Sequence, residues 1–192
     1  THIPLPAGRW VLALGGSGIG PAVLFWSLLG VFALVSLGLG RTELTPLTWK
    51  HWFLLSIGLT QASVLAAAIV AGWFLAMGLR ASYQPRESRE FKAAQLFLAG
   101  LTVLAAACLF GSIKRGLLGA PDMQITGNGS EAGLLRWYLD LADGGLPRPW
   151  ALSVPMAVYR AAMLGWALWL ANSMLRWTRW AWGAYTTEGL WK

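Results

Sequence analysis

The sequence predicts an all-α integral membrane protein with four transmembrane helices. The chain of 192 residues is 56% hydrophobic and only 12% charged, whereas a soluble domain carries about twice that charged fraction. Its uncharged runs are long enough to cross a bilayer core of about 30 Å, which requires about 20 apolar residues. Because a helix satisfies its own backbone hydrogen bonds in lipid, we expect residues 1–192 to form a single helical membrane domain.

The clearest span runs from Trp52 to Leu79, a stretch of about 28 residues without a formal charge. Lys50 precedes this run and Arg80 follows it, so charge ends the span on both sides. Trp52 and Trp73 are of the residue type that prefers the membrane interface. We therefore predict one continuous helix over residues 52–79.

The other three spans are predicted at about 21–39, 93–113 and 154–175. The first follows the segment GGSGIGP, in which glycines weaken a helix and Pro21 suits the first turn of a new one. This break is either a turn at the membrane surface or a helix N-terminus that lines a substrate site. Before it, we expect an interfacial or partly inserted segment at residues 10–14.

The connection between the third and fourth spans, from Lys114 to about Ser153, is the longest in the chain. Its segment LLRWYLDLA places apolar residues on one helical face, which predicts an amphipathic helix lying on the membrane. These apolar residues are Leu134, Leu135, Tyr138, Leu139 and Ala142. The nearby Asn128-Gly129-Ser130 is formally a glycosylation acceptor, but we expect a plain Asn-Gly turn.

Small residues recur at four-residue spacing in three of the predicted spans, and such rows let another helix approach closely. The rows are Ser63, Ala67 and Ala71; Ala107 and Gly111; and Ala157, Ala161 and Gly165. We expect these rows to form helix-packing surfaces. Trp166 and Trp169 are expected to be exposed in mid-span and to contribute to association with other subunits.

Three polar residues within the spans, Gln61, Arg160 and Asn172, are the candidate ligand-binding residues. A charge inside a span is a functional-site candidate by default, and Arg160 has the chemistry to hold an anion. The alternative is that Arg160 and Arg176 extend to opposite interfaces and frame a short span. Neither His2 nor His51 has a cysteine or carboxylate at ligand spacing, so we predict no metal, no cofactor and no catalytic residue.

The net charge of +7 is scattered over span ends, which favours anionic lipid headgroups over nucleic acid as the partner. The lone Cys108 excludes an intrachain disulfide. Near the C-terminus, an aromatic belt at the headgroups is predicted from Trp177, Trp180, Trp182 and Trp191.

The distribution of lysines and arginines predicts the orientation of the chain. The side that holds the N-terminus, residues 80–92 and the C-terminus carries eight of them, against six on the other side. This difference favours the first side as cytoplasmic.

Four stretches of the chain are distinctive: LGGSGIGPAVLFW, LTPLTWKHWFLLSIGLTQ, LLGAPDMQITGNGS and LRWYLDLADGGLPRPWALSVPMAVYR. Together they resemble the C-terminal membrane region of very long, uncharacterised bacterial envelope proteins. The resemblance implies a membrane anchor that follows a large extramembrane portion, and a start at Thr1 agrees with a piece of a longer chain. If that portion lies outside the cytoplasm, so does the N-terminus, against the charge count, and the orientation stays open.

We therefore expect a non-enzymatic, multi-pass anchor or assembly subunit of a complex in the bacterial inner membrane. Its expected partners are membrane lipids and other membrane subunits, or the large extramembrane portion of the same protein. The alternative is a transporter or channel component that binds an anion or lipid near Arg160.

Overall fold

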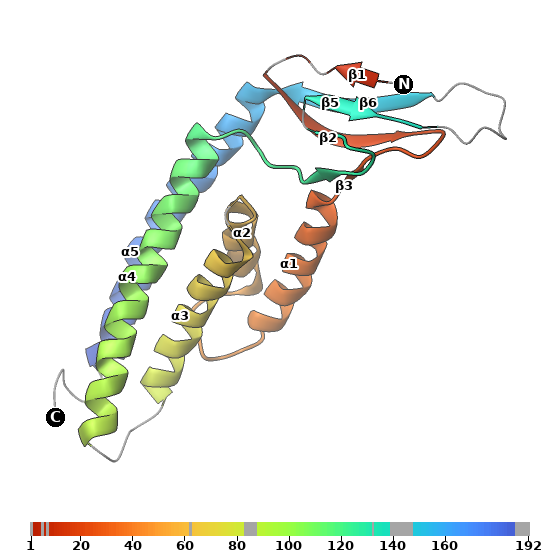
Figure 1. The fold of residues 1–192 in the computed structure, drawn as a ribbon. Helices are drawn as coiled ribbons and strands as arrows, with labels where there is room; N and C mark the ends of the chain where they lie inside the picture. The colour runs from red at the N-terminus through yellow and green to blue at the C-terminus, as the bar shows by residue number, and fades with distance from the viewer. Residues whose placement is uncertain are drawn as a thin grey trace. The chain divides into compact units, whose positions relative to one another are not determined.

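The computed structural model describes residues 2–4, 6, 8–61, 63–82, 88–131, 133–138 and 148–186. Five helices make up most of these residues, and six short strands accompany them (Figure 1). The contacts divide the chain into two units. The strand unit comprises Thr1–Gly30 and Ala120–Ala162, and the helical unit comprises Val31–Gly119 and Met163–Lys192.

Three two-stranded antiparallel sheets form the strand unit, so the expectation of a purely α-helical fold is wrong for this part of the chain. The pairs are β1 (His2–Pro4) with β5 (Leu134–Arg136), β2 (Arg9–Gly16) with β6 (Pro149–Pro155), and β3 (Ala22–Val23) with β4 (Ile125–Thr126). In the longest pair Arg9 lies opposite Pro155 and Gly16 opposite Pro149, with a register shift between Val11 and Ala13. The expected interfacial segment at residues 10–14 is thus part of a strand.

Hydrogen bonds from the Arg9 side chain link β2 to β6. Its Nε donates to Ser153 Oγ at 2.8 Å, and its Nη2 donates to the Ser153 carbonyl oxygen at 2.7 Å. Trp10, the next residue, packs edge-on against Tyr159 with ring centroids 5.2 Å apart. The two residues therefore connect β2 to β6 and to the start of the following helix.

The amphipathic helix predicted from Leu134 is a second correction, because the described part of that segment is extended. Leu135 and Trp137 are almost fully buried, whereas Tyr138 is exposed, and this alternation is the two-residue period of a strand. Hydrogen-bond partners for the strand come from β1, which lies far away in sequence. The remainder of the predicted helix, residues 139–142, lies outside the described residues.

The Asn-Gly turn is confirmed. Asn128 and Gly129 have φ values of 56° and 65°, and Ser130 N donates to Gly127 O at 2.9 Å. Two successive residues with positive φ are typical of a type I′ turn, which asparagine and glycine tolerate best.

The five helices are α1 (Phe25–Leu39), α2 (Trp49–Leu59), α3 (Val64–Ser82), α4 (Ser88–Leu118) and α5 (Met156–Thr186). Among the described residues, α3 and α4 are long and apolar enough to cross a membrane, and α1 is a shorter apolar helix. The predicted span 93–113 lies within α4. The span predicted at 21–39 begins later, at Phe25, because Ala22 and Val23 pair with β4, and that predicted at 154–175 begins at Met156 and continues to Thr186.

The continuous helix predicted over residues 52–79 is wrong, because the chain turns between α2 and α3. Thr60 N donates to Ser56 O at 2.9 Å and ends α2. Ser63 Oγ then accepts a hydrogen bond from Ala66 N at 3.2 Å, as an N-cap serine does immediately before a helix. Thr60, Gln61 and Ser63 therefore lie at the turn of a helical hairpin and not within a continuous span.

Trp166 of α5 packs against α2 at Gly58. The indole Nε1 donates to Leu54 O at 2.7 Å, and a Cβ at Gly58 would overlap the indole ring. Trp166 is consequently buried, which corrects its expected exposure. Glycine is required here because it gives the large ring access to the helix backbone.

Adding a methyl group at Gly58 should therefore destabilise the fold. We expect Gly58→Ala to lower the free energy of unfolding by about 1–3 kcal/mol, the usual cost of overpacking. Gly72→Ala on α3 is the control, because no atom lies within 4 Å of its added Cβ; higher helix propensity should leave that variant unchanged or up to about 1 kcal/mol more stable. Thermal unfolding in detergent measures both, and equal midpoints would contradict the close contact.

Candidate functional site

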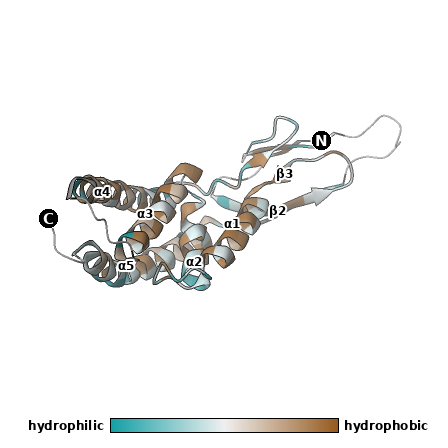
Figure 2. Cartoon of the chain, turned by 90° about the horizontal axis from the view of Figure 1, so that it is seen from below, coloured by the Kyte–Doolittle hydropathy of each residue, from teal (hydrophilic) through white to brown (hydrophobic). Residues whose placement is uncertain are grey.

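The helical unit exposes large apolar side chains and buries polar ones. Hydrophobic colour runs along much of its helices (Figure 2). The apolar exterior, as we name this surface, includes Val31, Leu34, Leu65, Leu79, Leu96, Phe97, Val103, Phe110, Leu168 and Leu175. Exposed apolar side chains in this number favour a membrane or a protein partner that covers them.

Two buried polar side chains of the helical unit contact neighbouring helices. Gln95 is fully buried on α4, and its Nε2 donates to Tyr185 O of α5 at 3.2 Å. Tyr185 Oη approaches Gln95 O at 3.5 Å in return. On α3 the buried Arg80 places its guanidinium 4.9 Å from the centre of the Phe91 ring, a cation–π distance.

Sequence reasoning selected Gln61 as a buried polar residue and missed Gln95, although both interrupt apolar runs. Gln95 stands alone in AAQLFL, where neither neighbour is polar. An isolated polar residue of this kind in an apolar helix points to an interhelical hydrogen bond. The isolated glutamine in AAQLFL is therefore a sequence signal from which the buried hydrogen bond of Gln95 can be predicted.

An aromatic cluster holds α2, α3 and α5 together. At its centre lies Phe74, with an exposed fraction of 0%. Three tryptophans pack edge-on against it, with ring centroids 4.6 to 5.4 Å away, and a fourth stacks at 6.2 Å. These are Trp73, Trp177 and Trp52 for the edge contacts and Trp180 for the stack.

This cluster changes the interpretation of the C-terminal tryptophans. Trp177, expected in a belt at the headgroups, is buried against Phe74, whereas Trp182 is exposed. Trp52 and Trp73, expected at the membrane interfaces, are also buried. Trp191 lies outside the described residues. Tryptophan content alone does not separate an interfacial ring from a core ring.

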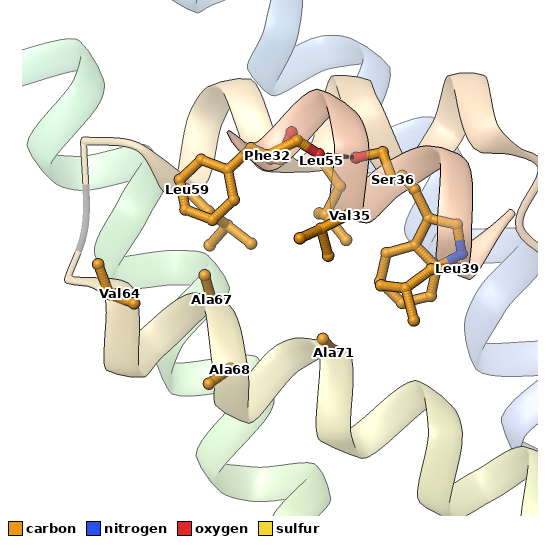
Figure 3. A pocket seen from close by; sticks show the side chains of 12 residues that line it. Phe32, Val35, Ser36, Leu39, Leu55, Leu59, Val64, Ala67, Ala68 and Ala71 are labelled. Atoms are coloured by element: carbon orange, nitrogen blue, oxygen red, sulfur yellow. Dashed lines mark hydrogen bonds between the residues drawn. The ribbon is translucent and has the colours of Figure 1, made fainter. Parts of the chain in front are cut away.

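An apolar cavity of about 170 Å³ lies between α1, α2 and α3. Phe32, Val35 and Leu39 of α1 and Leu55 and Leu59 of α2 enter it from one side, and Ala67, Ala68 and Ala71 of α3 lie on the opposite side (Figure 3). Among the described residues that line it, Ser36 and Ser56 carry hydroxyl groups, and each hydroxyl donates to a carbonyl of its own helix, Ser36 to Phe32 O and Ser56 to Phe53 O. The rest of the wall is hydrocarbon except for the indole of Trp52, whose buried Nε1 has no hydrogen-bond partner in the described chain.

Two of the predicted small-residue rows border open space. Ala67 and Ala71 line the cavity just described, and Ala107 and Gly111 line another of about 280 Å³ with Ser63, Ala66 and Cys108. The third row, Ala157, Ala161 and Gly165, is exposed along α5. Gly165 has no atom within 4 Å of an added Cβ, so this face of α5 is uncovered in the described chain.

The three predicted ligand-binding residues occupy different parts of the fold. Gln61 is half-buried in the turn between α2 and α3, and Asn172 is exposed on α5; both belong to the helical unit. Arg160 is exposed on the first turns of α5, within the strand unit. The cavity between α1, α2 and α3 is lined by neither Gln61 nor Asn172.

His51 has structural contacts at the start of α2. Its Nδ1 lies 2.8 Å from Thr48 Oγ1, and its ring stacks on Trp169 at 6.3 Å between centroids. In the part of the chain that the structure describes, no group of three or more His, Cys, Asp or Glu side chains is placed to hold a metal ion.

The aromatic cluster provides a direct test of the helical packing. We expect Phe74→Ala to lower the free energy of unfolding by about 3–5 kcal/mol, because it removes the ring on which four tryptophans pack. The matched control is Phe97→Ala on α4, where the ring is 65% exposed and the change should stay within about 0.5 kcal/mol. Near-UV circular dichroism monitors the unfolding of both variants in detergent. Similar losses in the free energy of unfolding for Phe74→Ala and Phe97→Ala would contradict a core centred on Phe74.

Comparison with known proteins found no matching family, no similar curated protein and no similar solved structure.

Proposed function

We propose that the chain is a non-enzymatic membrane anchor or assembly subunit of a complex in the bacterial inner membrane. The observation that carries this proposal is the apolar exterior of the helical unit, combined with its buried polar groups. Exposure of that apolar surface to water is unfavourable, whereas contact with lipid tails, which are equally apolar, is not. Two helices of sufficient length and apolarity, α3 and α4, support a membrane location.

In this proposal α1, α3, α4 and α5 cross the bilayer, and α2 joins α3 in a hairpin. α3 has 19 residues and α4 has 31, lengths of about 28 Å and 46 Å. The 15 residues of α1 cover about 22 Å. A short helix of this kind is accommodated by local thinning of the bilayer.

The partners proposed are lipids and other membrane subunits, or a large extramembrane portion of the same protein. The exposed row of Ala157, Ala161 and Gly165 supports association, because small residues let a second helix approach closely. The contacts of His51 with Thr48 and Trp169 support a structural role for that residue.

Isolation of the intact particle tests the anchor proposal. Native membranes would be extracted in mild detergent, and the particle and its chains weighed by mass spectrometry. We expect the chain to migrate within a longer polypeptide or with fixed partner subunits. A lone chain of 20.8 kDa, or a homo-oligomer with bound solute, would contradict the proposal. Release of the protein by alkaline carbonate would contradict its membrane location.

The second candidate function, binding of an anion or lipid near Arg160, is supported by the exposed position of that charge. Replacing Arg160 by glutamine distinguishes the anchor function from binding of an anion or lipid. We expect Arg160→Gln to assemble and express normally, because an exposed side chain is removed. Arg80→Gln is the control that should destabilise, since it removes a buried cation from the Phe91 ring. Normal expression of Arg160→Gln with loss of anion transport in vesicles would favour the carrier.

A further inference from the structure

The hairpin of α2 and α3 changes which side of the membrane each connection occupies. Trp52 near the start of α2 packs against Phe74 in the second half of α3, at 5.4 Å between ring centroids. At the other end, Leu59 and Val64 line the same cavity. Early residues of one helix thus meet late residues of the other, so the two helices are antiparallel, and the run 49–82 begins and ends at the same end of the helical unit.

The remaining helices of the unit also alternate in direction. α1 and α2 are antiparallel, because a Cβ at Gly40, just after α1, would meet the backbone of Trp49 at the start of α2, whereas Phe32 of α1 and Leu59 near the end of α2 lie toward the other end of the cavity (Figure 3). α3 and α4 are antiparallel as well, since Trp73 Nε1 donates to Thr102 Oγ1 at 2.9 Å and Arg80 lies over Phe91 near the start of α4.

α5 runs opposite to α4. A Cβ at Gly116, near the end of α4, would meet the Met163 side chain early in α5. Gln95, near the start of α4, bonds to Tyr185 at the end of α5. The chain direction therefore reverses at each of the four connections between α1 and α5.

From this alternation, and resting on the proposed membrane location, we infer that the two ends of the chain lie on opposite sides of the membrane. The segment before α1 shares a side with the connection between α4 and α5. The connections α1–α2 and α3–α4 and the C-terminus share the other side. A continuous helix over 52–79 would instead place both ends of the chain on one side.

The charge distribution then assigns the sides. Compared with the four-span prediction, the hairpin places Arg41 and Lys50 on the side of the C-terminus and Arg9 on the opposite side, and Arg160 is now counted with the latter. The side of the C-terminus now carries nine cations: Arg41, Lys50, Arg80, Arg86, Arg89, Lys92, Arg176, Arg179 and Lys192. The opposite side carries six: Arg9, Lys114, Arg115, Arg136, Arg148 and Arg160. Because cytoplasmic connections carry the excess of Lys and Arg, the C-terminus is cytoplasmic and the N-terminal segment is outside.

Single-cysteine labelling tests this topology. Cys108→Ser removes the only native cysteine, and Ser17→Cys, Glu43→Cys and Ala120→Cys are then introduced one at a time at exposed positions. A membrane-impermeant maleimide is applied to spheroplasts and to inverted vesicles. We expect Ser17→Cys and Ala120→Cys to label in spheroplasts, and Glu43→Cys to label only in inverted vesicles.

The result that overturns the inference is labelling of Glu43→Cys and Ala120→Cys from one side, with Ser17→Cys on the other. That outcome is the pattern of a continuous helix over 52–79. A green fluorescent protein fused to the C-terminus should fluoresce, because it folds in the cytoplasm; a dark fusion of normal abundance would also overturn the inference.

Failure of the underlying membrane proposal gives a different result. In that case alkaline carbonate releases the Cys108→Ser protein into the soluble fraction, whatever the labelling pattern. Retention in the membrane pellet with the opposite labelling pattern leaves the membrane proposal intact and rejects only the topology.

Discussion

The fold-back between α2 and α3 is the constraint on which the helical unit depends. Without it, the apolar run from residue 52 to 79 would form one helix of about 42 Å, longer than a bilayer core. The turn is possible because Thr60 ends α2 with a backbone hydrogen bond and Ser63 accepts one from the first turn of α3. These polar contacts satisfy backbone groups that a break in an apolar environment would otherwise leave unpaired. Every later helix takes its direction from this turn.

The apolar runs that form helices were predictable from the sequence, but their partners were not. Long uncharged stretches predicted helical structure within 21–39, 93–113 and 154–175, and α1, α4 and α5 occupy most of those residues. Hydropathy does not distinguish a helix from a hairpin when the turn contains only uncharged residues. The strands were missed because each is short and pairs with a segment more than 100 residues away. The candidate site was predicted least well: Trp166 and Trp177 are core residues, a property set by tertiary contacts with Gly58 and Phe74.

The revised topology also removes a conflict between two sequence-based inferences. The charge count for four spans placed the N-terminus in the cytoplasm, whereas the resemblance to envelope proteins implied a large extramembrane portion before it. With the hairpin, Arg41 and Lys50 join the side that already holds the C-terminus. An excess of cytoplasmic cations then agrees with an N-terminal segment outside the cytoplasm. The single turn between α2 and α3 therefore determines whether the two inferences are compatible.

Stability of such a unit in lipid has to come from packing and from hydrogen bonds between helices. Lipid tails are as apolar as leucine, so burial of apolar surface between helices gains little there. Three hydrogen bonds join three different helix pairs: Trp166 to Leu54 joins α5 to α2, Trp73 to Thr102 joins α3 to α4, and Gln95 to Tyr185 joins α4 to α5. The edge-on contacts of Phe74 join two further pairs, α3 to α2 through Trp52 and α3 to α5 through Trp177. Tryptophan is suited to this role because one side chain supplies both a large packing surface and a donor that reaches a neighbouring helix.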